Sequence, residues 1–163
     1  MSGPIRSPAE YAEAYASWRE DSPVPAAAET RLSLQLSSLR GLSVVRRQVQ
    51  QFLLSSLGIE GDEAATPAAE DAVERAVLVI DELTSNALRH GSAPSSLHIG
   101  DDEGRWIVIV SDGAPGQAPT PARERPAGQG GYGLYVIADL TAEHGVHYEP
   151  ARKLVWACLV KPT

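Results

Sequence analysis

The longest periodic segment of the sequence, from about Ala68 to His90, constrains the fold most strongly. At about 100° per residue its apolar side chains gather on one broad face. The residues of this face are Val73, Ala76, Val77, Ile80, Leu83, Ala87 and Leu88. Pro67 and Gly91 stand where such a helix would begin and end. The segment therefore predicts a long amphipathic helix with one face buried.

The rest of the chain alternates strand patterns with shorter helical patterns. Strands are expected at Arg31–Leu36, Ser96–Gly100, Arg105–Ser111, Val146–Tyr148 and Lys153–Val160, and helices at Pro8–Glu20, Gly41–Leu57 and Gly131–Leu140. This order predicts an α+β fold in which helices pack on a mostly antiparallel sheet. The proline-containing segment Asp21–Ala28 separates the first helix from the remainder, so we expect an N-terminal part, 1–28, and a main domain, 29–163.

Composition narrows the classes of function. The 163 residues carry 14 Lys plus Arg and 21 Asp plus Glu, a net charge of −7, which argues against general affinity for nucleic acid or an anionic membrane. The start of the chain lacks a signal-peptide pattern and no apolar run approaches the roughly 20 residues of a membrane span, so we expect a cytoplasmic protein. The single cysteine, Cys158, lies in an apolar run and is expected to be buried and unreactive.

Glu82 and Asn86 form the first candidate site. They are four residues apart on the long helix, so their side chains are neighbours. A solvated polar face is one interpretation, although Leu78 and Val79 are expected on that same face and need a cover. The other is chemical, because an amide oxygen can ligate Mg²⁺ while a carboxylate orients or deprotonates a nucleophile.

Asp112 and a glycine-rich stretch supply two further candidates. Asp112 ends an apolar strand, where it could accept a hydrogen bond from an exocyclic amine or simply initiate a turn. Gly128–Gly133 satisfies the G-x-G-x-x-G pattern, but a proline-rich loop precedes it, which disfavours a dinucleotide-binding fold. A phosphate-binding turn and a flexible hinge both stay open. The long loop Ala114–Gly130 has the length of a functional loop.

Taken together and in this order, the three segments resemble the motifs of a known family. Val79–Gly91 resembles the asparagine box of the Bergerat-fold (GHKL) ATPases, and more narrowly that of the anti-sigma factor serine/threonine kinases. Asp112 with Gly116 resembles the first glycine box, and Gly131–Ile137 the second. The resemblance covers roughly residues 32–160. It implies a two-layer α/β sandwich with helices on one face of a mixed, mostly antiparallel sheet.

The resemblance also implies roles for individual residues. Glu82 would be the general base, Asn86 the ligand of Mg²⁺, and Asp112 the residue that holds the adenine amine. The implied ATP-binding residues are Asn86, Asp112, Gly116, Gly130, Gly131, Gly133 and Leu134. Ala114–Gly130 would form a lid over the nucleotide.

The implied function is transfer of the γ-phosphoryl group of ATP to a serine or threonine of an antagonist protein, combined with sequestration of a sigma factor. A binding module without phosphoryl transfer is the alternative, favoured by Ala114, where the family tends to have glycine, and by Arg152–Leu154, where it often has Gly and Thr. A third alternative, the catalytic half of a sensor histidine kinase, is disfavoured because no phosphoacceptor helix or sensor segment is evident.

The apolar strands predict a covered outer face of the sheet. Trp106–Val110 and Leu154–Val160 are continuous apolar runs, whereas strands with one wet face alternate. A homodimer is the favoured cover, and the aromatic stripe Tyr11, Tyr15 and Trp18 folding back is the alternative.

Overall fold

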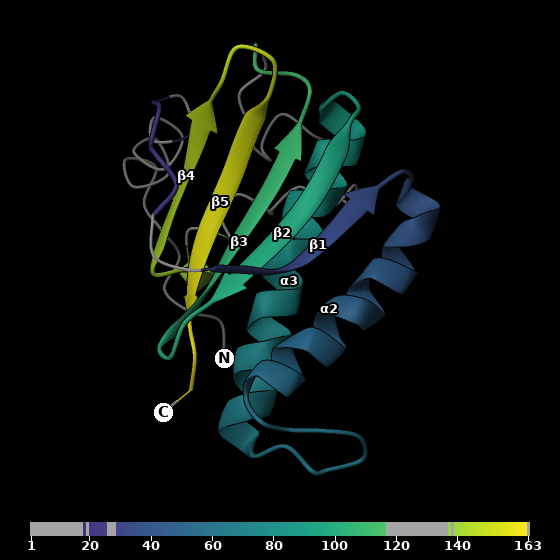
Figure 1. The fold of residues 1–163 in the computed structure, drawn as a ribbon, viewed down its shortest axis with the longest axis vertical. Helices are drawn as coiled ribbons and strands as arrows, with labels where there is room; N and C mark the ends of the chain where they lie inside the picture. Colours follow the sequence, from purple (N-terminus) through teal and green to yellow (C-terminus); the bar gives the residue numbers. More distant parts are fainter. Residues whose placement is uncertain (1–17, 19, 26–28, 117–136, 138, 163) are drawn as a thin grey trace.

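A computed structural model describes residues 18, 20–25, 29–116, 137 and 139–162. Its elements are β1 (Glu29–Leu36), the 3-10 turn η1 (Leu39–Gly41), α2 (Leu42–Ser56), α3 (Pro67–His90), β2 (Ser95–Asp101), β3 (Arg105–Asp112), β4 (Glu143–Tyr148) and β5 (Lys153–Val160) (Figure 1). The five predicted strands and the two central helices are confirmed within a few residues of their expected ends. The helix expected at Pro8–Glu20, most of that expected at Gly131–Leu140 and most of the lid lie outside the described residues.

The five strands form one sheet in the order β1-β2-β3-β5-β4. Each neighbouring pair is antiparallel. Within the described residues, parallel pairing is limited to a bridge between Asp21 and Val146 at the β4 edge, so the expected mixed sheet is almost entirely antiparallel. Because β3 and β5 are adjacent, residues 41 or more positions apart in sequence become direct neighbours at the centre of the sheet.

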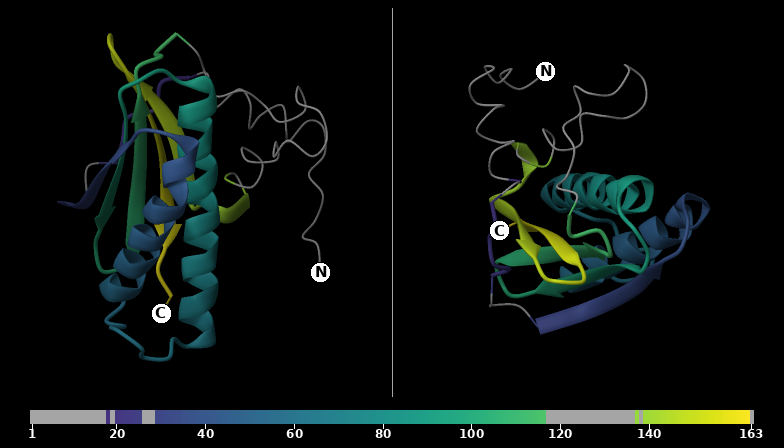
Figure 2. Two further views of the ribbon diagram at one scale, coloured as in Figure 1. Left: turned by 90° about the vertical axis from the view of Figure 1, so that its right-hand side faces the viewer. Right: turned by 90° about the horizontal axis from the view of Figure 1, so that it is seen from above.

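Helices α2 and α3 cover one face of this sheet and complete the expected two-layer α+β sandwich (Figure 2). Alternate residues of the central strands point into the space between the layers, among them the fully buried Trp106, Val108 and Val110. The indole Nε1 of Trp106 donates a 2.8 Å hydrogen bond to Ser56 Oγ near the end of α2. The core therefore lies between helices and sheet, as the periodic face of α3 predicts.

The ends of the two helices follow local sequence signals. The backbone of Gly58 has a φ of 79°, and the N–H groups of Gly58 and Ile59 bond to the carbonyls of Ser55 and Leu54, which ends α2 in a Schellman motif. At the start of α3, Thr66 Oγ1 accepts a 3.2 Å hydrogen bond from the Ala69 N–H and precedes Pro67.

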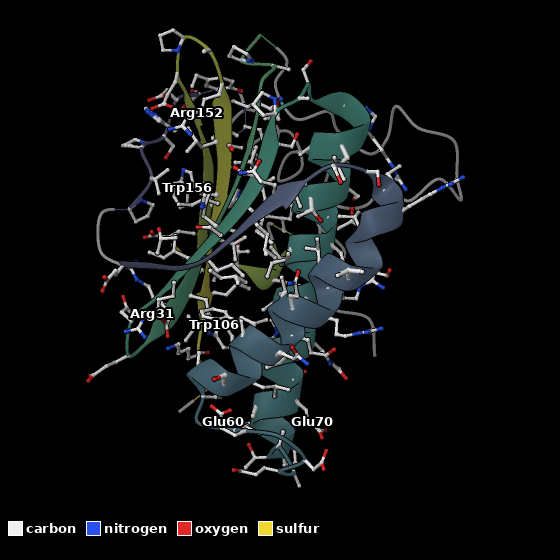
Figure 3. All side chains as sticks on the ribbon, turned by 45° about the vertical axis from the view of Figure 1, so that its right-hand side comes forward. Arg31, Glu60, Glu70, Trp106, Arg152 and Trp156 are labelled. Atoms are coloured by element: carbon white, nitrogen blue, oxygen red, sulfur yellow. The ribbon has the colours of Figure 1, made fainter. Side chains whose placement is uncertain are left out.

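The outer face of the sheet is covered in part by the chain itself. Ile107, Trp156 and Cys158 form a small cluster there, each at most 4% exposed, and Val24 packs against them. Trp156 Nε1 donates a 2.9 Å hydrogen bond to the Ser22 carbonyl (Figure 3). Burial is the leading cause that raises the pKa of the Cys158 thiol, which agrees with the expected buried, unreactive cysteine.

Residues 20–25, which we call the strap, therefore do more than link two parts of the chain. The strap runs beside β4 (Figure 1), where Asp21 forms a parallel bridge with Val146, and its Val24 packs on the outer-face cluster. Just before it, Trp18 is buried in the main core and its ring stacks on His144 at 4.7 Å. N-terminal residues thus fold back on the domain, but Trp18 of the expected aromatic stripe packs in the core between helices and sheet and not on the outer face, and Tyr11 and Tyr15 lie outside the described residues. Whether the protein also forms a homodimer stays a prediction.

A chain shortened to begin at Glu29 tests the strap. Loss of the strap exposes Ile107, Trp156 and Cys158, and loss of Trp18 opens the main core, so we expect unfolding to be about 3–5 kcal/mol easier and self-association to be stronger than in the full chain. Urea denaturation and sedimentation measure the two effects. Equal stability and equal association of the two chains would show that the strap is not a structural cover.

Candidate functional site

The long helix α3 presents Glu82 and Asn86 one turn apart, both half-buried, in its last three turns. The predicted core face is confirmed, since Val73, Ala76, Ile80, Leu83 and Ala87 are all buried. We expected Val79 on the polar face of α3 together with Leu78, and for Val79 this was wrong. Val79 is fully buried, whereas Leu78 is 44% exposed, so the apolar stripe of α3 is wider than the periodicity suggested. Glu82 and Asn86 consequently stand at the border of the core and not on a fully solvated face.

The C-terminal end of α3 lies directly against the end of β3. A Cβ atom at Gly91 would lie 2.5 Å from Asp112 Cγ and 2.6 Å from the Ala87 carbonyl oxygen, so any larger residue would force the two elements apart. One residue further, the Gly113 N–H donates a 2.6 Å hydrogen bond to the Ser92 carbonyl. The helix that carries Glu82 and Asn86 and the strand that ends in Asp112 are thus joined at one corner of the molecule.

Asp112 is 2% exposed and both of its oxygens have partners within the chain. Oδ1 accepts a 2.8 Å hydrogen bond from the Ala114 N–H, a turn geometry typical of aspartate. Oδ2 lies 3.4 Å from Lys153 Nζ, which also donates to the Ala114 carbonyl at 3.3 Å. The aspartate is therefore a buried acceptor placed at a loop, which suits recognition of a ligand amine.

The remaining predicted site residues are unevenly described. Gly116 is exposed in a turn four residues after Asp112, and a Cβ there would meet no atom within 4 Å. Gly130, Gly131, Gly133 and Leu134 lie outside the described residues, as does most of the lid expected at Ala114–Gly130. Their roles stay predictions.

Lys153 lies beside Asp112, and the sequence interpretation gave it no role. The sequence did indicate its burial, because side chains alternate along a strand and Lys153 falls on the same face as Val155, Ala157 and Leu159. These residues are buried, and their face is the one covered by the helices. What the sequence could not supply was the register of β3 on β5, which sets Asp112 opposite Lys153.

A hollow of about 570 Å³ lies at the other end of α3 and is distinct from this corner. Ala68 and Arg75 from the first half of α3 line it together with Lys161 and Pro162. Glu82, Asn86 and Asp112 do not line it. The predicted site residues are instead connected through the contact of Gly91, at the end of α3, with Asp112.

A metal site requires a suitable group of protein side chains. Among the described residues, no group of three or more His, Cys, Asp and Glu side chains could hold a metal ion. Mg²⁺ in nucleotide sites keeps several waters and is held by one or two protein oxygens together with substrate phosphates. A site with Asn86 as the protein ligand fits that pattern.

The family model of the histidine kinase-like ATPase domain matches residues 37–159, a span that includes α2, α3 and the whole sheet apart from β1 and the final residue of β5. No curated protein matched the sequence. In the described part of the chain, none of the helices combines the length and the apolar character needed to cross a membrane.

The Gly91→Ala variant tests the corner. The added methyl group collides with the Asp112 carboxyl and the Ala87 carbonyl, so we expect unfolding to be about 1–3 kcal/mol easier, measured by urea denaturation. Gly116→Ala is the matched control, because its Cβ enters open space and should leave stability unchanged. If Gly91→Ala and Gly116→Ala were both as stable as the unchanged protein, the contact between α3 and β3 would not be tight.

Proposed function

Because the chain belongs to the histidine kinase-like ATPase domain family, we propose that it binds Mg·ATP and acts as an anti-sigma factor serine/threonine kinase. In this proposal it transfers the γ-phosphoryl group to a serine or threonine of an antagonist protein, and it regulates a sigma factor by sequestering it. We further propose that it acts in the cytoplasm, without contacting nucleic acid.

The observation that supports the proposal is the contact between the end of α3, the helix that carries Glu82 and Asn86, and Asp112 at the end of β3. The half-buried pair Glu82 and Asn86 lies on the helix whose end, Gly91, contacts the buried Asp112. The carboxylate of Glu82 suits a general base, and the amide of Asn86 suits a metal ligand. The buried carboxylate of Asp112 suits a residue that recognises the adenine ring. The family relationship and the motif order support the same roles.

Bound Mg·ATP would supply an activated phosphoryl group whose negative charge the metal partly neutralises. The chain's own residues then divide the work. Glu82 orients the hydroxyl of the acceptor serine or threonine and accepts its proton, Asn86 contributes a neutral oxygen to the metal, and Asp112 accepts a hydrogen bond from the adenine amine. Phosphoryl transfer depends mainly on positioning and electrostatics, and each of these three groups contributes to one of them.

A partner-binding module without phosphoryl transfer is the second candidate function. It is favoured by the buried contact between Lys153 and Asp112, because the aspartate already has a cation beside it. Ala114 also stands where the family tends to have glycine. A direct measurement of nucleotide binding and of transfer separates this candidate from the kinase.

The Glu82→Ala variant tests the catalytic role. A base that acts on the acceptor hydroxyl contributes to transfer and not to nucleotide affinity, so we expect the transfer rate to fall by about 10²–10⁴-fold with ATP affinity nearly unchanged. Partners captured by pull-down and identified by mass spectrometry serve as acceptors for radiolabelled phosphate. Glu74→Ala, an exposed glutamate two turns earlier on α3, is the matched control and should keep full activity.

The Asn86→Ala variant should behave differently, since the amide acts on the metal. We expect weaker Mg²⁺-dependent ATP binding as well as reduced transfer. Equal loss of nucleotide binding in the Glu82 and Asn86 variants, or full activity of Glu82→Ala, would contradict the division of roles.

The Asp112→Asn variant tests the adenine assignment. Removing the charge of a buried acceptor should weaken adenine nucleotides by about 1–3 kcal/mol, the scale of one hydrogen bond to a charged group. Isothermal titration with ATP measures the change. Wild-type affinity in this variant would exclude Asp112 as the residue that holds the base.

A further inference from the structure

Helix α2 has an exposed side that is basic, although the protein as a whole is acidic. We propose that this side docks an acidic segment of a partner protein that also presents apolar side chains. The surface, which we call the arginine face, consists of Leu39, Arg40, Ser43, Val44 and Arg47. The proposed function also requires partner proteins, but this inference depends on neither nucleotide binding nor phosphoryl transfer.

Charge is unevenly distributed along the chain. None of the 21 acidic residues lies between residues 30 and 59, the range that holds most of β1 together with η1 and α2. The same range contains four arginines and no lysine, so it carries a formal charge of +4 in a chain whose total is −7. Such segregation of charge creates a local positive potential that attracts negatively charged groups.

Two of these four arginines are available to a partner. The other two are paired within the chain, Arg46 with Asp81 at 2.9 Å and Arg31 with Asp101 at 3.0 Å. Arg40 and Arg47 are exposed, and in the described part of the chain neither forms an ion pair. The planar guanidinium group offers a fork of N–H donors that matches a carboxylate. The arginine face therefore suits carboxylate groups.

Helical spacing places the exposed residues on one side of α2. Val44 and Arg47 are three residues apart, and Arg40 stands four residues before Val44 in η1, which continues directly into α2. The buried residues of α2, Val49 and Leu53, lie on the opposite side of the helix. Figure 1 shows α2 at one margin of the molecule, beside α3, so the arginine face points away from the core.

Two exposed apolar side chains among the arginines favour a protein partner over a nucleic acid. Leu39 is 46% exposed and Val44 is 57% exposed. Phosphate groups are bound by cations and hydrogen-bond donors, which these two residues do not supply, whereas apolar side chains of a partner protein would cover them. The acidic residues in the rest of the chain would also repel a polyanion. The fitting partner is therefore an acidic segment with apolar side chains on one side.

Peptide binding to the full chain tests the arginine face. The probe is a fluorescein-labelled helical peptide with leucines along one side and glutamates flanking them, and fluorescence anisotropy measures its binding. We expect it to bind about tenfold more tightly than the same peptide with lysines in place of the glutamates, or with serines in place of the leucines. Its binding should weaken as salt rises from about 50 to about 300 mM, because exposed ion pairs are screened.

Variants of the full chain link this binding to the arginine face. Replacing both arginines, Arg40→Glu with Arg47→Glu, should weaken binding of the acidic peptide about tenfold, and Val44→Ser should weaken it about fivefold. Arg89→Glu is the matched control, because Arg89 is an exposed arginine on α3 outside the face, and it should bind like the wild type. If the charge reversal disturbs α2, Arg40→Gln with Arg47→Gln replaces it and should also weaken binding.

Four results would overturn the inference. They are no binding of the acidic peptide, equal binding of the lysine peptide, an equal loss in Arg89→Glu and in the double arginine variant, and tighter binding of a short DNA duplex than of the acidic peptide. The outcomes are separate from those of the proposed function. A chain that binds the peptide but no ATP keeps the arginine face and ends the nucleotide site, and the reverse result keeps the nucleotide site alone.

Discussion

The approach of Gly91 to Asp112 fixes the geometry on which the proposed site depends. A Cβ at position 91 would lie 2.5 Å from the carboxyl carbon of Asp112, so the end of α3 and the end of β3 can meet only if one of them lacks a side chain. Gly91 has a φ of −87°, which any residue adopts, so its role is close packing and not backbone freedom. The contact between Gly91 and Asp112 also fixes where Glu82 and Asn86 lie relative to β3, because all of α3 is one regular helix.

The second constraint is that a two-layer sandwich covers only one face of its sheet. Helices α2 and α3 cover the inner face, and the strap places Val24 and Ser22 over Trp156 and its neighbours on the outer face. Asp21 anchors the strap, since its Oδ1 accepts a 2.7 Å hydrogen bond from the Tyr148 N–H and lies 3.1 Å from His147 Nδ1. This arrangement explains how continuous apolar strands exist without a helix on each side.

Local signals in the sequence were enough for the elements and for part of the site. Thr66, Pro67 and Gly58 act within one helical turn, and the pair Glu82 and Asn86 needs only helical spacing, so all could be predicted. The errors and omissions concern contacts between distant segments. The burial of Val79, the strap on Trp156 and the pairing of Asp112 with Lys153 depend on tertiary packing and strand register, which no short pattern encodes.

Two buried lysines, Lys153 and Lys161, lie near opposite ends of β5. A buried ion pair contributes little net stability compared with apolar residues of similar volume, because desolvation offsets the attraction. Lys161 has a structural use even so, since its Nζ contacts both Asp101 Oδ2 and the Asp102 carbonyl and so ties the end of the chain to the β2–β3 turn. Lys153 Nζ donates to the Ala114 carbonyl and lies 3.4 Å from Asp112 Oδ2, so it connects the start of β5 to the loop that follows β3. Each lysine therefore joins one end of β5 to a neighbouring turn, and both turns owe their positions to a buried cation.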